Sequence, residues 1–148
     1  MGYRMMRLTD YVDGYIDVPF GYSPVILTFD DGIRDVVLEG WSAECTPNFD
    51  PTCAIGILEQ IKAAYPDYNV TATFFVNSGL FGNGEEDDRK VRKWMVDNGY
   101  DIGNHTWDHV KLGDCTADEI EKQVGKMYQK LDEIIPGQYV NIVALPFG

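Results

Sequence analysis

The chain has 148 residues, and 12 Lys and Arg against 24 Asp and Glu give it a formal net charge of −12 at pH 7. A hydrophobic content of 45% with 13% aromatic residues is typical of a folded domain and excludes a disordered chain. This acidity argues against nucleic acid and anionic lipid as partners, because both bind concentrated basic side chains. No apolar run approaches the roughly 20 residues that span a bilayer. We expect one domain over residues 1–148.

The three cysteines, Cys45, Cys53 and Cys115, are too few for a disulfide scaffold and lack metal-ligand spacing. In an oxidising compartment Cys45 and Cys53 close a short loop, whereas two free thiols fit the sequence as well. Residues 1–13 show neither the apolar stretch nor the cleavage site of a signal peptide.

Strand and helix patterns alternate along the chain, which predicts βα units around a largely parallel sheet. The predicted strands, in chain order, are 25–29, 70–76, 100–103 and 139–145. The predicted helices are 53–65, 85–98 and 116–135. A stretch rich in Gly, Pro, Asn and Ser predicts a long loop over 39–52. Thr116 and Glu119 have the spacing of a capping box at the start of the last helix.

Two adjacent carboxylates, Asp30 and Asp31, directly follow the first predicted strand. In parallel sheets and barrels, active sites form at the carboxyl ends of the strands. Neighbouring strand residues point to opposite faces, but a turn at Gly32 can bring both carboxylates toward one pocket. Taken alone, the Asp-Asp-Gly sequence also fits a turn with an aspartate as helix N-cap.

The only two histidines of the chain, His105 and His109, follow the predicted strand 100–103. On a helical turn their spacing places both rings on one face, about 5–6 Å apart, where they can bind one metal ion. Two surface histidines at a helix start are the alternative. With one of the two aspartates they form a three-ligand set with an open position, and the other aspartate is free to act as a general base. These residue types indicate hydrolytic chemistry.

Three short motifs, T-F-D-D-G at 28–32, H-T-x-x-H at 105–109 and L-P-F-G at 145–148, occur in this order. They resemble the first three motifs of the polysaccharide deacetylases, the NodB-homology group of carbohydrate esterase family 4. The likeness covers about residues 20–148. It implies an α/β fold, a partial distorted (β/α) barrel cut after the third motif. It also implies hydrolysis of N-acetyl, or O-acetyl, groups on sugar polymers such as N-acetylglucosamine glycans or peptidoglycan.

The resemblance also implies a role for each motif residue. Asp30 resembles the catalytic base, acting on a metal-bound water. The residues that resemble the metal ligands are Asp31, His105 and His109. The backbone N–H of Phe147 lies where the family has an oxyanion donor, and Pro146 and Trp107 are expected beside the substrate. The ligand types imply Zn²⁺, with Co²⁺, Ni²⁺ or Mn²⁺ as alternatives.

The sequence departs from the family pattern in its third motif and beyond it. Ala144 stands where the family usually has an arginine that holds the base. The fourth motif, and the fifth with its histidine acid, lie downstream in the family and are not present. A catalytically silent domain that binds metal or glycan without turnover is therefore an alternative. A metal-dependent hydrolase of a non-sugar amide is another, because metal motifs do not select the substrate.

Both ends of the sequence look unusual for a whole domain. Residues 2–6 resemble the middle of a domain, and no helix follows the predicted strand 139–145. We therefore expect a fragment of a larger chain. A truncated barrel exposes strand edges and apolar surface, so we also expect this chain to form homodimers, with exchange of elements. The resemblance places the protein outside the cell or at its surface, because the family acts mostly on cell-wall or secreted polymers.

Overall fold

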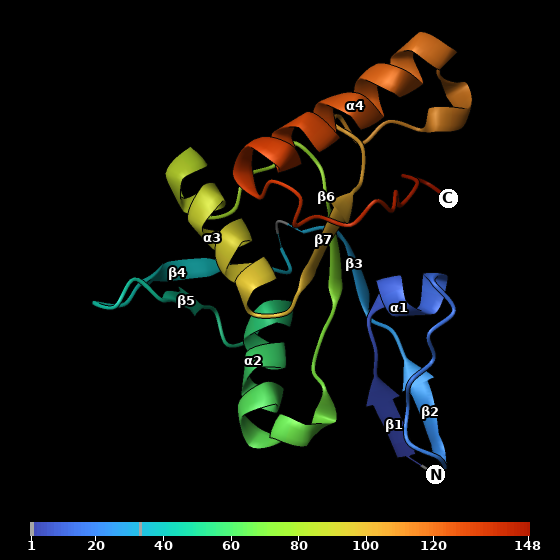
Figure 1. Ribbon diagram of the computed structural model, residues 1–148. Coiled ribbons are helices and arrows are strands. Elements are labelled where there is room, and N and C mark those ends of the chain that lie inside the picture. The colour runs from blue at the N-terminus through green and yellow to red at the C-terminus, as the bar shows by residue number, and fades with distance from the viewer. Residues whose placement is uncertain (1, 33) are drawn as a thin grey trace.

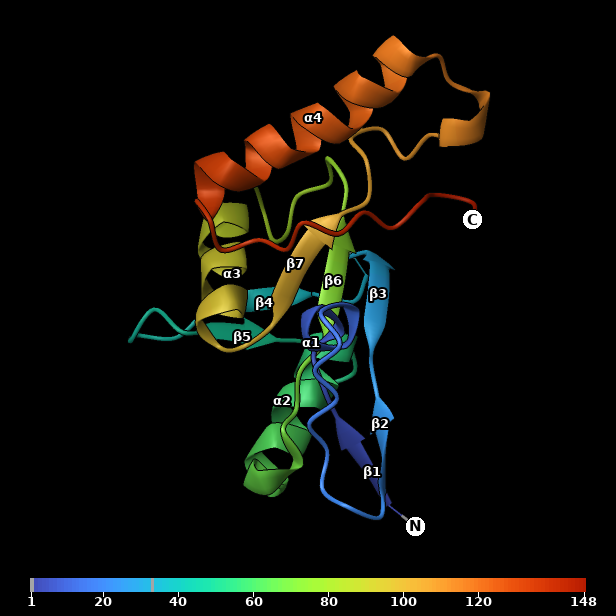
Figure 2. The same ribbon diagram turned by 45° about the vertical axis from the view of Figure 1, so that its right-hand side comes forward.

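The structure is a computed structural model that describes residues 2–32 and 34–148. At its centre three parallel strands lie side by side in the order β3-β6-β7 (Figure 1). Their bounds are β3 (Thr28–Asp31), β6 (Thr73–Val76) and β7 (Asp101–Asn104). The register aligns Asp31, Val76 and Asn104, so the three carboxyl ends meet at one edge of the sheet (Figure 2). The α/β prediction is confirmed.

The helices formed where the sequence patterns predict them. Their bounds are α2 (Ala54–Ala64), α3 (Glu85–Asp97) and α4 (Ala117–Ile134), with a short α1 (Leu8–Val12) and two 3₁₀ turns, η1 (Pro66–Tyr68) and η2 (Leu112–Asp114). The capping box is present, because Thr116 Oγ1 accepts from the Glu119 N–H and the Glu119 carboxylate accepts from the Thr116 N–H. The apolar stripe of α4 buries Met127 and Leu131, and α3 and α4 both contact β7.

The predicted loop over 39–52 is wrong, because this stretch contains most of an antiparallel hairpin. β4 (Leu38–Trp41) pairs with β5 (Pro47–Phe49). The Ser42 hydroxyl accepts from the N–H groups of Glu44 and Thr46, which closes the connecting turn. The side chains of Trp41 and Phe49 pack against the core and anchor the hairpin. The pairing was not predicted, because the sequence of this stretch is polar and contains Gly and Pro, which is typical of a loop.

Two strand predictions also need correction. The predicted strand 25–29 is split between β2 (Tyr22–Val25), which pairs in parallel with β1 (Gly2–Met5), and β3, which continues through Asp31. β3 therefore ends with Asp30 and Asp31, whereas the predicted strand stopped before them. Residues 139–145 form a single bridge, Asn104 to Val143, and not a full strand. Backbone hydrogen bonds still hold this segment along β7, from Val140 N–H to Ile102 O among others.

The core lies between the sheet and the helices. All four residues of β6 are buried, as expected for a central parallel strand covered on both faces. Phe74 stacks on Phe29 at 5.0 Å and meets Tyr100 edge-on at 6.0 Å. Each buried side chain of this size stabilises the fold by about 2 kcal/mol. This packing fixes the carboxyl edge of the sheet.

Two further expectations concern the state of the cysteines and the presence of membrane-spanning helices. Cys45, Cys53 and Cys115 are all free thiols, and Cys53 is buried where α2 begins. None of the helices in residues 2–32 and 34–148 is both long and apolar enough to cross a bilayer.

Candidate metal centre

The end of β3 bends sharply at Asp31. The Gly32 N–H donates to the Asp30 carbonyl at 2.8 Å, and Asp31, between them, has a φ of +67°. A hydrogen bond between residues i and i+2 whose central residue has a positive φ defines a γ-turn of the rare and strained kind. A Cβ on Gly32 would lie 3.1 Å from the Phe81 ring, and φ there is +77°, so glycine is required. The turn brings Asp30 and Asp31 to the same cavity, as the sequence predicted.

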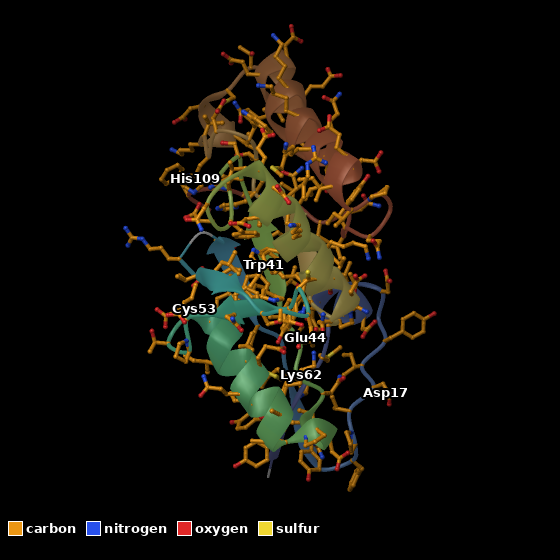
Figure 3. The ribbon with its side chains drawn as sticks, turned by 90° about the vertical axis from the view of Figure 1, so that its left-hand side faces the viewer. Asp17, Trp41, Glu44, Cys53, Lys62 and His109 are labelled. Carbon is orange, nitrogen blue, oxygen red and sulfur yellow. The ribbon has the colours of Figure 1, made fainter. Side chains whose placement is uncertain are left out.

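The histidine loop follows β7 directly, but it is not the helical turn that the spacing suggested. Thr106 and His109 have φ values of +65° and +53°. The Asn104 side chain accepts from the Thr106 N–H at 2.8 Å and so closes a local turn at the strand end. The two imidazole rings still approach to 4.9 Å. Figure 3 shows His109 toward the α4 end of the molecule, far from Lys62 on α2.

Asp31, His105 and His109 offer ligand atoms that all lie within 4.8 Å of one another. Asp31 Oδ1 is 3.8 Å from His105 Nε2 and 3.4 Å from His109 Nε2. Two atoms that bind one ion at about 2.0–2.2 Å lie less than about 4.4 Å apart, and both distances from Asp31 to a histidine nitrogen meet this condition. The sequence prediction of these three residues as neighbours is confirmed in space.

The tautomer of His105 also suits a metal ligand. Its Nδ1 lies 3.0 Å from the Ala144 carbonyl oxygen, which can only accept a hydrogen bond. A neutral His105 therefore carries its proton on Nδ1, and the lone pair of Nε2 faces Asp31. A metal-binding histidine usually donates its other ring N–H to a carbonyl or carboxylate in this way. Among the described side chains, the Asp31, His105 and His109 set thus fits a divalent cation.

Backbone strain marks the same place independently of the motifs. Six non-glycine residues of the described chain have a positive φ, and four of them are Asp31, Thr106, His109 and Phe147. Each such conformation costs about 1–3 kcal/mol and persists only where surrounding contacts enforce it. Strain of this kind gathers at functional sites. The concentration of four such residues here supports a site at this edge of the sheet.

A cavity of about 650 Å³ opens beside the metal set. Its lining residues are Asp30, Asp31, Arg34, Asp35, Asn77 and His109. Arg34 is the only Lys or Arg in that lining. Burial raises the pKa of Asp35, and the negative charges of Asp31 and Asp30 raise it further. A cavity with this much negative charge attracts cations.

Comparison with known proteins identifies the family. The sequence profile described as polysaccharide deacetylase matches residues 17–148. The chain belongs to the polysaccharide deacetylase family. The resemblance carried by the three short motifs is thereby confirmed.

Three relatives set the scale of the likeness. Peptidoglycan-N-acetylglucosamine deacetylase of Bacillus cereus is 31% identical over 130 residues, which cover 88% of this chain and 38% of the relative. Chitooligosaccharide deacetylase of Sinorhizobium fredii is 27% identical over 143 residues, covering 97% of this chain and 55% of the relative. The Streptococcus pyogenes deacetylase PplD in complex with acetate shares the fold, with a TM-score of 0.65 at 20% identity, covering 99% of this chain and 56% of that chain. This chain spans between 38% and 56% of the length of these three proteins.

The third motif of the chain lies next to the histidines. The Phe147 ring meets the His109 ring edge-on at 4.8 Å, and Phe147 itself is exposed, while Pro146 is buried. Trp107 is half-buried, and the ammonium of Lys126 on α4 lies 4.7 Å from its ring centroid. Trp107 is not among the residues that line the cavity.

Sequence reasoning missed three residues that line this cavity, Arg34, Asp35 and Asn77. Asn77 could have been predicted, because it directly follows β6 and so lies at the same sheet edge as Asp31 and His105. No motif marks Arg34 or Asp35, which reach the cavity through the turn after Gly32.

Proposed function

We propose that this chain is a metal-dependent hydrolase that removes N-acetyl, or O-acetyl, groups from a sugar polymer. The observation that carries the proposal is the convergence of Asp31, His105 and His109 beside the Asp30 cavity. In a member of the polysaccharide deacetylase family, this arrangement supplies both a cation site and a general base.

The metal ligands in this proposal are Asp31, His105 and His109, and the ligand types favour Zn²⁺, with Co²⁺, Ni²⁺ or Mn²⁺ as alternatives. When bound, the ion supplies electrophilic polarisation of the acetyl carbonyl. The Ala144 carbonyl keeps the His105 ring oriented through Nδ1. The contact is made by the backbone carbonyl, so it does not depend on the side chain at position 144.

The remaining steps belong to the chain itself. Asp30, as a carboxylate in the cavity, accepts the proton of the attacking water and then returns it to the leaving amine or alcohol of the sugar. The backbone N–H of Phe147 donates a hydrogen bond to the developing oxyanion, and a donor of this kind is worth about 10²–10³ in kcat. The cavity of about 650 Å³ is large enough for a sugar unit.

The substrate class follows from what two relatives have in common. One is named for peptidoglycan N-acetylglucosamine and the other for chitooligosaccharide. Both names denote glycans that contain acetylated glucosamine, so we assign this unit to the present chain. Such polymers lie outside the cell or at its surface, and this is the location that we propose. We also propose that the three-stranded parallel sheet is an arc of a distorted (β/α) barrel, in keeping with the PplD likeness.

Acetate release tests the proposal. The chain, loaded with Zn²⁺ or Co²⁺, is incubated with N-acetylglucosamine oligomers and with peptidoglycan, and free acetate is measured. We expect release by the wild-type chain, a loss of about 10²–10⁴-fold for Asp30→Asn, and no loss for Asp114→Asn, an exposed control on η2. Metal-loaded wild type that releases no acetate from either glycan would contradict sugar deacetylation.

A further inference from the structure

The loop between β6 and α3 touches the metal set through one side chain, Asn77. Its Nδ2 donates to Asp31 Oδ1 at 2.9 Å. Its Oδ1 accepts from the Gly79 N–H at 2.9 Å. Because a backbone N–H can only donate, this second bond fixes which end of the amide faces Asp31. The amide is therefore held with its donor toward the carboxylate.

Asp31 has little else to hold its side chain. The carboxylate is 55% exposed, and Asn77 is the only described residue that donates a hydrogen bond to it. The two histidine nitrogens near it, His105 Nε2 and His109 Nε2, lie at 3.8 and 3.4 Å. A carboxylate that rotates freely loses side-chain entropy when it binds a metal. The hydrogen bond from Asn77 already restricts the rotation of the Asp31 carboxylate, so less entropy is lost when a metal binds.

Three further hydrogen bonds hold residues 78–81 of the loop that carries Asn77. The Ser78 N–H donates to the carbonyl of Trp107, which joins the loop to the histidine loop. Arg92 Nη2 donates to the Gly79 carbonyl at 3.0 Å. The Phe81 N–H donates to Asp88 Oδ1 at 3.0 Å.

Two of these ties come from a buried ion pair on α3. Asp88 and Arg92 are both 1% exposed in their side chains, and Arg92 Nε lies 2.8 Å from Asp88 Oδ1. Asp88 Oδ2 and Arg92 Nη1 have no hydrogen-bond partner among the described residues. Burying such a pair costs so much desolvation energy that its net gain in stability is small. Its clearest effect here is to hold the loop, because both members bond to it.

We infer that Asn77 is a positioning residue for Asp31, held in place by the buried Asp88–Arg92 pair through the loop they share. This inference rests on the proposed metal role of Asp31. Asn77 adds no charge and touches no substrate atom in this account. It sets the direction in which Asp31 Oδ1 faces the two histidines.

Metal binding without turnover tests the inference. Zn²⁺ affinity is measured by competition with a chelating dye, and Co²⁺ binding by its visible absorption, for wild type, Asn77→Ala and Asn48→Ala. Asn48 is an exposed residue of β5, so its variant is the matched control. We expect Asn77→Ala to weaken Zn²⁺ binding by about 10–100-fold and to change the Co²⁺ spectrum. Asn48→Ala should change neither.

The outcomes separate the inference from the proposed function. If wild type binds no Zn²⁺, the metal role of Asp31 fails, and the inference fails with it. If wild type binds Zn²⁺ and Asn77→Ala binds it as tightly as Asn48→Ala, the positioning role is overturned while the metal site stands. Thermal unfolding in EDTA is followed in parallel. A weaker affinity with an unchanged unfolding midpoint supports positioning, and a weaker affinity with a matching fall in midpoint overturns it.

Discussion

Replacing Arg92 by methionine tests how firmly α3 supports the loop beside the site. The variant loses the 2.8 Å bond to Asp88 and the 3.0 Å bond to the Gly79 carbonyl, while methionine keeps most of the apolar stem. Removing one member of a buried pair leaves an uncompensated charge and costs about 3–5 kcal/mol. With a urea dependence of about 2 kcal/mol per M, a loss of about 4 kcal/mol lowers the urea midpoint by about 2 M. Equilibrium unfolding in urea, with EDTA in the buffer, measures this shift of the midpoint.

Two companion variants show whether the buried charge is the cause. Lys90 pairs with Glu86 on the exposed face of the same helix, and Lys90→Met should leave the midpoint unchanged within error. Adding Asp88→Asn to Arg92→Met removes the unpaired charge, so the double variant should be more stable than Arg92→Met alone. Equal midpoints for Arg92→Met and Lys90→Met would refute the reasoning.

Three further predictions concern the cavity, the packing and the assembly. Because the pKa of Asp35 is raised from 3.8 in the folded chain, ionising it costs stability as the pH rises through that raised value. In EDTA, the melting temperature of Asp35→Asn should therefore exceed that of wild type at neutral pH. Below pH 3.8 the two melting temperatures should be equal. A Cβ on Gly56 would lie 2.1 Å from the Asp50 carbonyl oxygen, whereas Gly125 in α4 faces open space. Measured by urea unfolding, the free energy of unfolding should fall by about 1–3 kcal/mol or more for Gly56→Ala and rise by about 0.5–1 kcal/mol for Gly125→Ala. Sedimentation velocity at micromolar concentration should show a homodimer, and a monomer there would contradict that proposal.

The helices were predictable because their signals are local. An apolar stripe and a capping box placed α4 within a residue of its observed bounds. The β4–β5 hairpin was missed because its pairing depends on contacts that sequence periodicity does not report. The Ser42 hydroxyl closes its turn, and Trp41 and Phe49 reach the core from a stretch that is otherwise polar. The pairing partner of such a strand is a tertiary property.

The site was predictable in its residue types but not in its backbone. Charged and imidazole groups after parallel strands indicated where Asp31 and the histidines would meet. The left-handed conformations of Thr106 and His109 could not be read from the sequence, since a β-branched threonine disfavours them. They are held by the Asn104 amide at the strand end and by the Trp107 N–H bond to the Gln123 carbonyl on α4. The bond to α4 lies beyond any local sequence pattern.

The zinc content of the purified chain shows whether Asp31, His105 and His109 hold a metal ion. Wild type, Asp31→Asn, His105→Ala and the exposed control Asp114→Asn are equilibrated with Zn²⁺, freed of loosely bound ions and analysed for metal. We expect near-stoichiometric zinc in wild type and in Asp114→Asn, and its loss in Asp31→Asn and His105→Ala. Wild type without zinc, or zinc retained by both site variants, would contradict the claim that Asp31, His105 and His109 form the metal centre.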